Sequence, residues 1–212
     1  MSAVAIIDSG GANIASLRFA LQRLGAEPVL TRDAEVLLGA RHVLLPGVGA
    51  AADAMKRLRE SGLDAVIRDL TQPVLGICLG MQLLFERSVE GEVECLGIID
   101  GCVEPLPAGP DLCVPHMGWN QTRRPGVGVG LSNSDSHSNS NIGLLEGIAE
   151  DAYFYFVHSY AAAIGPATAA VTTHGVEFSA VVSRLNFHGT QFHPERSGAA
   201  GARVLKNFLE LT

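Results

Sequence analysis

The chain has 212 residues, with 15 Lys and Arg against 22 Asp and Glu and a formal net charge of −7. This acidic balance argues against binding to a nucleic-acid backbone, which needs a basic surface. Hydrophobic residues make up 47% of the sequence and charged residues only 17%. We therefore expect a sizeable core, no extensive disorder, and a surface partly covered by a partner.

Three features of the sequence concern where the protein works. It has no run of 18 apolar residues, so no membrane span is predicted. The first twenty residues lack a basic segment and meet Asp8 early, so we expect no secretory signal. The four cysteines form no C-x-x-C pair, which argues against a disulfide scaffold or a zinc site and favours a reducing cytoplasm.

The first 85 residues alternate between short apolar runs and helical patterns. Strands are predicted at residues 4–8, 28–31, 42–45 and 74–77, and helices at 13–24, around 36–37, at 50–60, at 63–70 and from Cys78 through 85. Strands that alternate with helices at this spacing indicate βαβ units and a parallel sheet covered on both faces.

The second half is richer in predicted strands, at residues 96–99, 112–114, 152–158, 167–173, 178–185 and 187–192, before a final helix at 199–211. Residues 132–141 contain only Ser, Asn, Asp and His, which indicates a surface loop with no assigned function. The predicted fold class is α/β: an open, mostly parallel sheet flanked by helices, with an antiparallel addition in the C-terminal half. One domain is expected over residues 1–212.

Cys78 stands in the segment Gly76-Ile77-Cys78-Leu79-Gly80, between a predicted strand and a helix. The pattern G-x-C-x-G is the thiol counterpart of the nucleophile elbow G-x-S-x-G. Its glycines permit a strained turn that leaves the sulfur uncrowded, and the helix N-terminus favours negative charge there. The alternative is a buried structural cysteine, but the flanking glycines and the strand–helix junction favour a nucleophile.

A thiol nucleophile needs a base, and that base needs an orienting partner. Among seven histidines, His193 stands out because it lies in Gln191-Phe192-His193-Pro194-Glu195 at the end of a predicted strand. Glu195 can reach the far nitrogen of its ring. The alternative is a surface histidine beside a solvated glutamate, and the spacing alone does not decide between them.

The turn Pro46-Gly47-Val48-Gly49 follows another predicted strand. Its N–H groups, together with that of Leu79, could stabilise an oxyanion. Alone this motif is weak, since many turns between a strand and a helix have similar composition. The three elements at successive strand ends together suggest a cysteine amide hydrolase.

Longer segments of the chain match a known family. The segments GICLGMQLLFE (76–86), QFHPERS (191–197) and LPGVG (45–49) resemble the triad-type, class I glutamine amidotransferases. PHMGWN (115–120) and YFYFVHSY (153–160) narrow this resemblance to the glutaminase subunits of imidazole glycerol phosphate synthase, in histidine biosynthesis. The resemblance covers essentially the whole chain.

The resemblance implies a triad in which Cys78 attacks the side-chain carboxamide of glutamine, His193 transfers protons and Glu195 orients His193. The groups that it implies for the oxyanion are the N–H of Leu79 and that of Gly47 or Val48. The residues that it implies for holding the glutamine α-carboxylate and α-amino group are Gln82, Glu90, Ser159 and Tyr160. Glu90 is the least secure of these, because Glu86, Glu92 and Glu94 stand in the same loop.

The resemblance also implies a partner. Ammonia would pass through a tunnel into a (βα)8 cyclase subunit, forming a heterodimer without cofactor or metal. The residues that match partner-facing or tunnel-side positions are Asn13, His116, Met117, Trp119, Asn120, Tyr155 and Arg196. From the residues alone, PHMGWN is equally compatible with core packing around the single Trp and with an interface anchor.

Three other functions are compatible with parts of this pattern. The chain could be a glutaminase that feeds a different synthase, such as an anthranilate or pyridoxal-phosphate synthase, which PHMGWN and the length disfavour. A non-catalytic regulatory module is disfavoured because Cys78, His193 and Glu195 are all present. A redox sensor at Cys78 is weaker still, because no second cysteine lies close in sequence.

Overall fold

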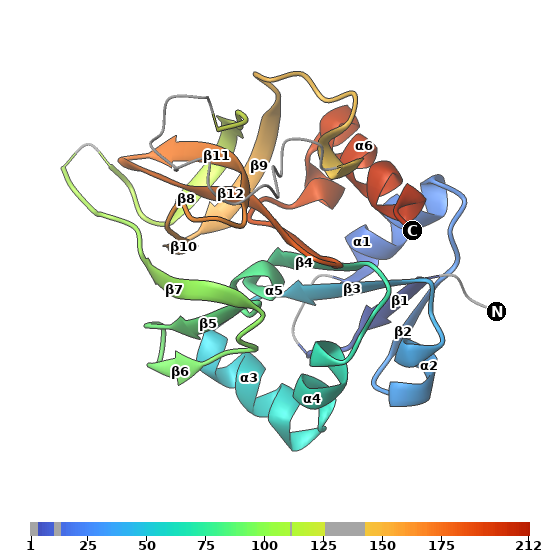
Figure 1. Ribbon diagram of the computed structural model, residues 1–212. Coiled ribbons are helices and arrows are strands. Elements are labelled where there is room, and N and C mark those ends of the chain that lie inside the picture. The colour runs from blue at the N-terminus through green and yellow to red at the C-terminus, as the bar shows by residue number, and fades with distance from the viewer. Residues whose placement is uncertain (1–3, 11–13, 111, 126–142) are drawn as a thin grey trace.

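The computed structural model describes residues 4–10, 14–110, 112–125 and 143–212, and a seven-stranded sheet lies at its centre (Figure 1). The strands of this sheet are β1 (Val4–Ile7), β2 (Pro28–Thr31), β3 (His42–Gly47), β4 (Val74–Cys78), β11 (Thr168–His174), β12 (Val176–Arg184) and β13 (Phe187–Thr190), in the order β11-β12-β13-β4-β3-β1-β2. The five strands from β13 to β2 are parallel, and β12 and β11 add to them antiparallel. The predicted fold class is confirmed.

Helices cover both faces of the central sheet (Figure 1). They are α1 (Ile14–Arg23), α2 (Ala34–Leu38), α3 (Ala51–Glu60), α4 (Leu63–Arg68), the short α5 (Leu79–Gln82) and α6 (Gly198–Glu210). Within the described part of the chain, no helix is both long and apolar enough to cross a membrane.

Strand β1 shows how the sheet separates two cores. All four of its residues are buried. Val4 and Ile6 belong to the core that includes residues of α1 and α6, whereas Ala5 and Ile7 belong to the core that includes residues of α3 and α4. Successive residues of a strand point to opposite faces, so a continuous apolar run is what a strand covered on both sides requires.

Two smaller sheets stand beside the central one. One has the order β10-β7-β5-β6, made of β5 (Phe85–Ser88), β6 (Val93–Glu94), β7 (Ile99–Pro105) and β10 (Tyr160–Ala162). The other is a two-stranded antiparallel ribbon of β8 (His116–Gln121) and β9 (Tyr153–His158). Two 3₁₀ segments complete the described elements, η2 (Gly143–Leu145) and η3 (Pro194–Arg196).

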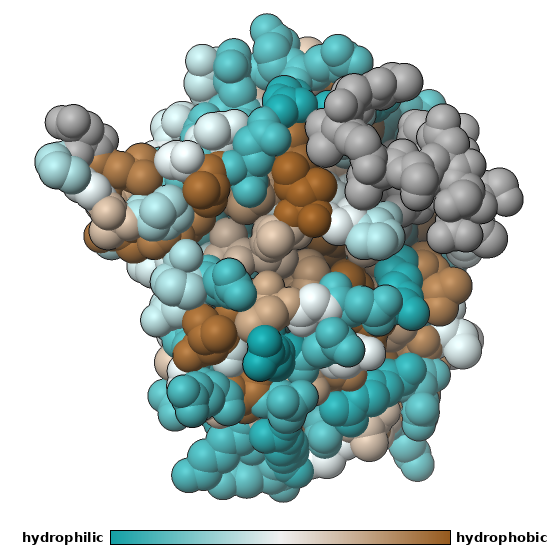
Figure 2. All heavy atoms as spheres, turned by 60° about the vertical axis from the view of Figure 1, so that its left-hand side comes forward, coloured by the Kyte–Doolittle hydropathy of each residue, from teal (hydrophilic) through white to brown (hydrophobic). Residues whose placement is uncertain are grey.

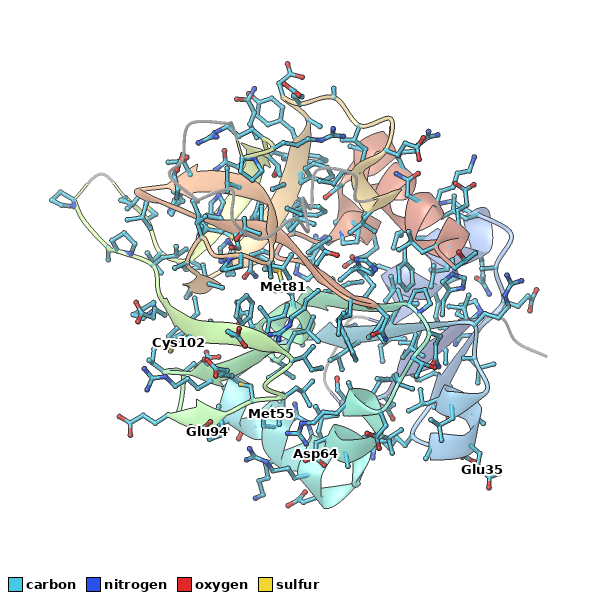
Figure 3. All side chains as sticks on the ribbon, viewed as in Figure 1. Glu35, Met55, Asp64, Met81, Glu94 and Cys102 are labelled. Atoms are coloured by element: carbon cyan, nitrogen blue, oxygen red, sulfur yellow. The ribbon has the colours of Figure 1, made fainter. Side chains whose placement is uncertain are left out.

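The surface and the interior contrast clearly in the side-chain views. Figure 2 brings the β5–β7 side forward and shows hydrophobic patches in its upper and middle part, above a mostly hydrophilic lower part. In Figure 3, Met81 of α5 lies near the centre of the molecule, whereas Glu35, Asp64 and Glu94 lie toward its periphery. Met81 is fully buried and lies close to Gly189 of β13, so α5 is packed against the central sheet.

Several sequence predictions were wrong in this outer region. The helix after Cys78 ends at Gln82 rather than 85, and the chain continues as β5. The predicted strand at 96–99 begins only at Ile99, and the one at 112–114 is absent, whereas β8 from His116 was not predicted. These strands belong to the two smaller sheets, where strand propensity depends on cross-strand neighbours, so the local pattern carries little of the signal. The predicted loop at 132–141 lies outside the described residues.

Candidate active site

Cys78 lies at the junction of β4 and α5, in a backbone conformation with φ of 54° that non-glycine residues rarely adopt. The glycines around it allow this turn to close against β3. A Cβ on Gly80 would lie 1.7 Å from the carbonyl oxygen of Leu45, and one on Gly76 would lie 2.6 Å from that of Gly80. The predicted strand–turn–helix at Cys78 is therefore confirmed, with strain stored at the thiol position.

Besides His193, whose side chain hydrogen-bonds to it, two groups contact the Cys78 sulfur. Its Sγ donates to the carbonyl oxygen of Val157 on β9, at 3.8 Å. It also accepts a hydrogen bond from Nε2 of Gln191, again at 3.8 Å. Gln191 is fully buried and was not among the predicted site residues. The available signal was its spacing, because extended residues two apart point the same way and Gln191 stands two before His193.

His193 and Glu195 form a buried pair. Nδ1 of His193 lies 2.9 Å from Oε1 of Glu195, whose side chain is 6% exposed. Burial lowers the pKa of His193, but hydrogen bonds to Cys78 and Glu195 outweigh it and raise the pKa to about 10. Oε2 of Glu195 has no hydrogen-bond partner among the described residues. The three predicted triad residues thus come together at the His193 imidazole. Its contacts with Cys78 and Glu195 favour the protonated form of this ring.

The backbone of β9 supports both reactive side chains. The N–H of His193 donates to the carbonyl oxygen of Tyr155 at 2.9 Å, just as Cys78 reaches Val157 two residues along the same strand. Ser197 ties the same region together: its Oγ donates to the carbonyl oxygen of His193 at 2.7 Å and accepts the N–H of Tyr155 at 2.9 Å. A displacement of β9 would therefore move the Cys78 thiol and the His193 imidazole together.

A small cavity opens beside the pair. Its lining consists of Leu17, Pro46, Gly47, Val48, Ile77, His193 and Glu195. Gly47 is the register partner of Cys78 between β3 and β4. A Cβ at Gly47 would lie 2.8 Å from the backbone nitrogen of Gly80, so only glycine allows β3 to approach the turn this closely. The predicted oxyanion turn is thus adjacent to the triad.

Gln82 and Glu90 are the predicted substrate residues whose contacts are most informative. Gln82 is buried, and its Nε2 donates to the carbonyl oxygen of Tyr160 at 2.8 Å and to Oε1 of Gln191 at 3.0 Å. Oε2 of Glu90 accepts the N–H of Ala51 at 2.9 Å. Ala51 begins α3, two residues after the Pro46–Gly49 turn, whereas Glu86, Glu92 and Glu94 are exposed. Ser159, half-buried, lies between β9 and β10.

The residues predicted to face a partner divide into two groups. Met117 and Trp119 on β8 are 67% and 55% exposed. The Trp119 ring lies edge-on to Tyr155 of β9, and the guanidinium of Arg196 lies 4.8 Å from the Tyr155 ring centre. We call Met117, Trp119, Tyr155 and Arg196 the ribbon face.

The other predicted partner-facing residues lie elsewhere. His116 is buried, with an exposure of 5%, because odd and even residues of β8 point to opposite sides. Asn120 shares this inner side and is half-buried. Asn13 lies outside the described residues.

The chain is similar to known proteins over nearly its whole length. The profile of the family described as Glutamine amidotransferase class-I matches residues 5–211. The chain belongs to the class-I glutamine amidotransferase family. This membership confirms the family that the sequence motifs predicted.

Particular relatives of this amidotransferase narrow the similarity. It is 50% identical over 212 residues to the imidazole glycerol phosphate synthase subunit HisH of Xanthomonas axonopodis pv. citri (strain 306), which covers 100% of this chain and 99% of that one. A protein of the same name from Xylella fastidiosa (strain Temecula1) is 50% identical over 211 residues, covering 100% and 98%.

Solved structures support the fold of this amidotransferase. One described as a glutamine amidotransferase has a TM-score of 0.71 at 21% identity, covering 98% of this chain and 97% of that one. The structure of PurLQS from Thermotoga maritima has a TM-score of 0.68 at 18% identity, covering 99% of each chain. At these identities the likeness concerns the fold alone.

Proposed function

We propose that this amidotransferase hydrolyses glutamine to glutamate and ammonia with Cys78, His193 and Glu195, and delivers the ammonia to a cyclase subunit in histidine biosynthesis. The observation that carries the proposal is the buried His193–Glu195 pair beside a strained cysteine at the end of β4. The 50% identity to HisH subunits over the whole chain supports the pathway and disfavours a different synthase. We further infer that residues 1–212 form one amidotransferase domain.

The chemistry follows from the contacts of the triad. The Cys78 thiol passes its proton to His193, and its sulfur attacks the carboxamide carbon of glutamine while the electron pair of the C=O bond moves to oxygen. When the tetrahedral intermediate collapses, the C–N bond breaks and protonated His193 supplies the proton that lets nitrogen leave as ammonia. Neutral His193 then takes a proton from water, which attacks the γ-glutamyl thioester and releases glutamate. Glu195 orients the imidazole and stabilises its charged form.

The oxyanion of the tetrahedral intermediate needs N–H donors close to the attacked carbon. We assign this role to Leu79, which begins α5, and to Gly47 or Val48 beside it. The close approach of Gly47 to the backbone of Gly80 supports this assignment, as does the shared cavity with His193.

For the amino-acid end of glutamine, we assign Gln82, Glu90, Ser159 and Tyr160. Glu90 is favoured over its neighbouring glutamates because its carboxylate already faces the start of α3, next to the proposed oxyanion turn. Its Oε1 remains to receive the α-amino group. The Glu90 carboxylate would then bind the α-amino group of the substrate and the start of α3 at once, which links substrate binding to the proposed oxyanion turn.

The ribbon face is the proposed docking surface for the cyclase. Exposed Met and Trp side chains beside an Arg–Tyr contact are typical of interface anchors. We propose a heterodimer with a (βα)8 barrel, in which ammonia reacts with a ribulosyl intermediate to give imidazole glycerol phosphate and an aminoimidazole carboxamide ribotide, the lyase half of the reaction. Four unpaired cysteines support a cytoplasmic setting.

The test is glutamate release by the purified chain, alone and with a cyclase subunit loaded with its ribotide substrate. We expect strong stimulation by the loaded partner, and none in the Cys78→Ala variant. Robust activity without any partner would retain the glutaminase but remove the synthase-subunit assignment. No activity under either condition would contradict the catalytic proposal.

A further inference from the structure

The Cys78 sulfur is the inner end of a continuous series of hydrogen bonds. Nε2 of Gln191 donates to Sγ, and Oε1 of Gln191 accepts from Nε2 of Gln82 at 3.0 Å. Nε2 of Gln82 also donates to the carbonyl oxygen of Tyr160. Gln191 and Gln82 are 0% and 4% exposed, so neither amide can exchange these partners for water at low cost.

The series continues outward from Tyr160 to the ribbon. Its carbonyl oxygen accepts a second hydrogen bond, from Nδ1 of His158 at 2.9 Å. Nε2 of His158 lies 3.0 Å from Nδ1 of His116, and Nε2 of His116 lies 3.1 Å from Nδ2 of Asn120. The outer end is therefore on β8, next to Trp119 but on the opposite side of the strand.

The two ends of this series determine its direction. The amide nitrogen of Asn120 can only donate, and the carbonyl oxygen of Tyr160 can only accept. His116 must therefore carry its proton on Nδ1 and donate it to Nε2 of His158, which must carry its own proton on Nδ1. Burial lowers the pKa of His116 to about 4 and that of His158 to about 3, so each ring holds one proton at neutral pH.

Asn120 is itself oriented by backbone groups. Its Nδ2 also donates to the carbonyl oxygen of Thr173 at 2.9 Å, and its Oδ1 accepts the N–H of Gln121 at 2.8 Å. The series therefore has two discrete states: the observed direction, or a reversed one in which both rings exchange tautomer and an imidazole lone pair faces the Tyr160 carbonyl. A substitution that reverses the hydrogen bond at Asn120 therefore changes the tautomer of both His116 and His158.

We propose that Asn120, His116 and His158 form a positioning chain that orients Gln82 and Gln191 and, through Gln191, the Cys78 thiol. Contact with β8 thereby reaches the nucleophile through hydrogen bonds, without movement of the main sheet. Gln191 acts on the thiol directly, and the other members act through it. This inference rests on the proposed role of Cys78 as the nucleophile, and it adds a route by which that nucleophile is regulated.

The sharpest perturbation is Asn120→Asp. A carboxylate is close to the amide in size but cannot donate to Nε2 of His116, so it favours the reversed direction. The matched control is Gln121→Glu, which adds the same charge at the next position, where the side chain is exposed. The readout is alkylation of Cys78 by iodoacetamide in the isolated full chain, followed at the Cys78 peptide by mass spectrometry across pH.

We expect Gln191→Leu to slow alkylation at pH 7 by about tenfold, because the sulfur loses a donor that favours its reactive anion. Asn120→Asp should slow it by about threefold, with the pH profile moved to higher pH, while Gln121→Glu changes it by less than about twofold. In the double variant Gln191→Leu/Asn120→Asp, the second substitution should add nothing, because Asn120 acts only through Gln191.

Additive effects in the double variant would overturn the proposal, and so would an equal effect of Gln121→Glu. Thermal unfolding monitors folding, and Gln191→Met replaces Gln191→Leu if the latter does not fold. The alkylation requires neither glutamine nor partner. If the positioning chain is wrong, the two substitutions will have additive effects on alkylation while Cys78 remains reactive. If the proposed function is wrong, glutamate release will be missing.

Discussion

The carboxyl edge of β3, β4 and β13 and the β8–β9 ribbon contribute to the same site in different ways. At the edge, each group of the proposed mechanism lies at or just beyond the end of a parallel strand, and neighbouring strands bring Gly47, Cys78 and His193 together. In the ribbon, six residue pairs join His116–Gln121 to Tyr153–His158, and no reactive group belongs to it. The ribbon instead supplies carbonyl oxygens that hold Cys78 and His193.

We infer that the edge supplies the proposed chemistry and that the ribbon controls it. On the proposed mechanism, a substitution at the edge removes a group that makes or breaks a bond, whereas a substitution in the ribbon changes how well those groups are held.

Cys78→Ala should abolish glutamine-dependent synthesis by the complex, lowering it by about a thousandfold or more, because the nucleophile is lost. Ammonia-dependent synthesis should remain, since free ammonia bypasses the edge. Product formation with each nitrogen source measures both. Loss of both activities in a folded complex would contradict the proposed division of labour.

Gly80→Ala should destabilise the fold by about 3 kcal/mol, because the added Cβ would meet the Leu45 carbonyl oxygen and force β3 away from α5. Gly165→Ala is the control, since no atom lies within 4 Å of its added Cβ, and it should cost less than about 1 kcal/mol. Urea unfolding measures both. Equal free energies of unfolding for Gly80→Ala and Gly165→Ala would show that the turn at Cys78 is not tightly packed.

Glu195→Gln should lower glutamate release by about tenfold to a hundredfold and leave measurable activity, because the orienting group matters less than the nucleophile. It should also lower the pKa of His193, which NMR titration of the imidazole measures. If Glu195→Gln changed neither glutamate release nor the pKa of His193, Glu195 would not belong to the triad.

The same pair predicts how stability depends on pH. The pKa of His193 is raised from 6.5 to about 10 on folding, so its contribution to stability is complete below pH 6.5 and is lost as pH rises through about 10. Urea unfolding from pH 6 upward should show a smaller loss in Glu195→Gln than in the native chain.

Trp119→Ala should weaken binding of the cyclase by about tenfold, because it removes an exposed aromatic from the centre of the ribbon face. Leu185→Ala is the matched control: this residue is 86% exposed but lies in the turn between β12 and β13. Isothermal titration calorimetry measures both affinities. Equal weakening by the two substitutions would place the partner elsewhere.

The edge was largely predictable because its signals are local. The pattern around Cys78 requires close glycines, and Glu195 stands two residues from His193, so both features survive in a short window of sequence. Each of these depends on nearby residues or on the parallel order of the strands.

The ribbon was not predictable to the same degree. Residues 112–114 were expected to be extended, but the strand begins at His116, where β9 offers a partner. Its pairing register decides that His116 points inward and Trp119 outward. A shift of one residue would exchange the two faces, and nothing in the local sequence selects between the registers.

Sequence alone predicted the family and the parallel sheet and singled out Cys78, His193 and Glu195 as the proposed triad, because apolar periodicity, glycine sterics and short motifs are properties of neighbouring residues. The folded structure alone shows that Glu90 contacts the start of α3, that Gln191 contacts the Cys78 sulfur and that His116 joins a buried hydrogen-bond series. Those contacts join residues 39 or more positions apart, and burial then removes the water that would otherwise compete for the same polar groups.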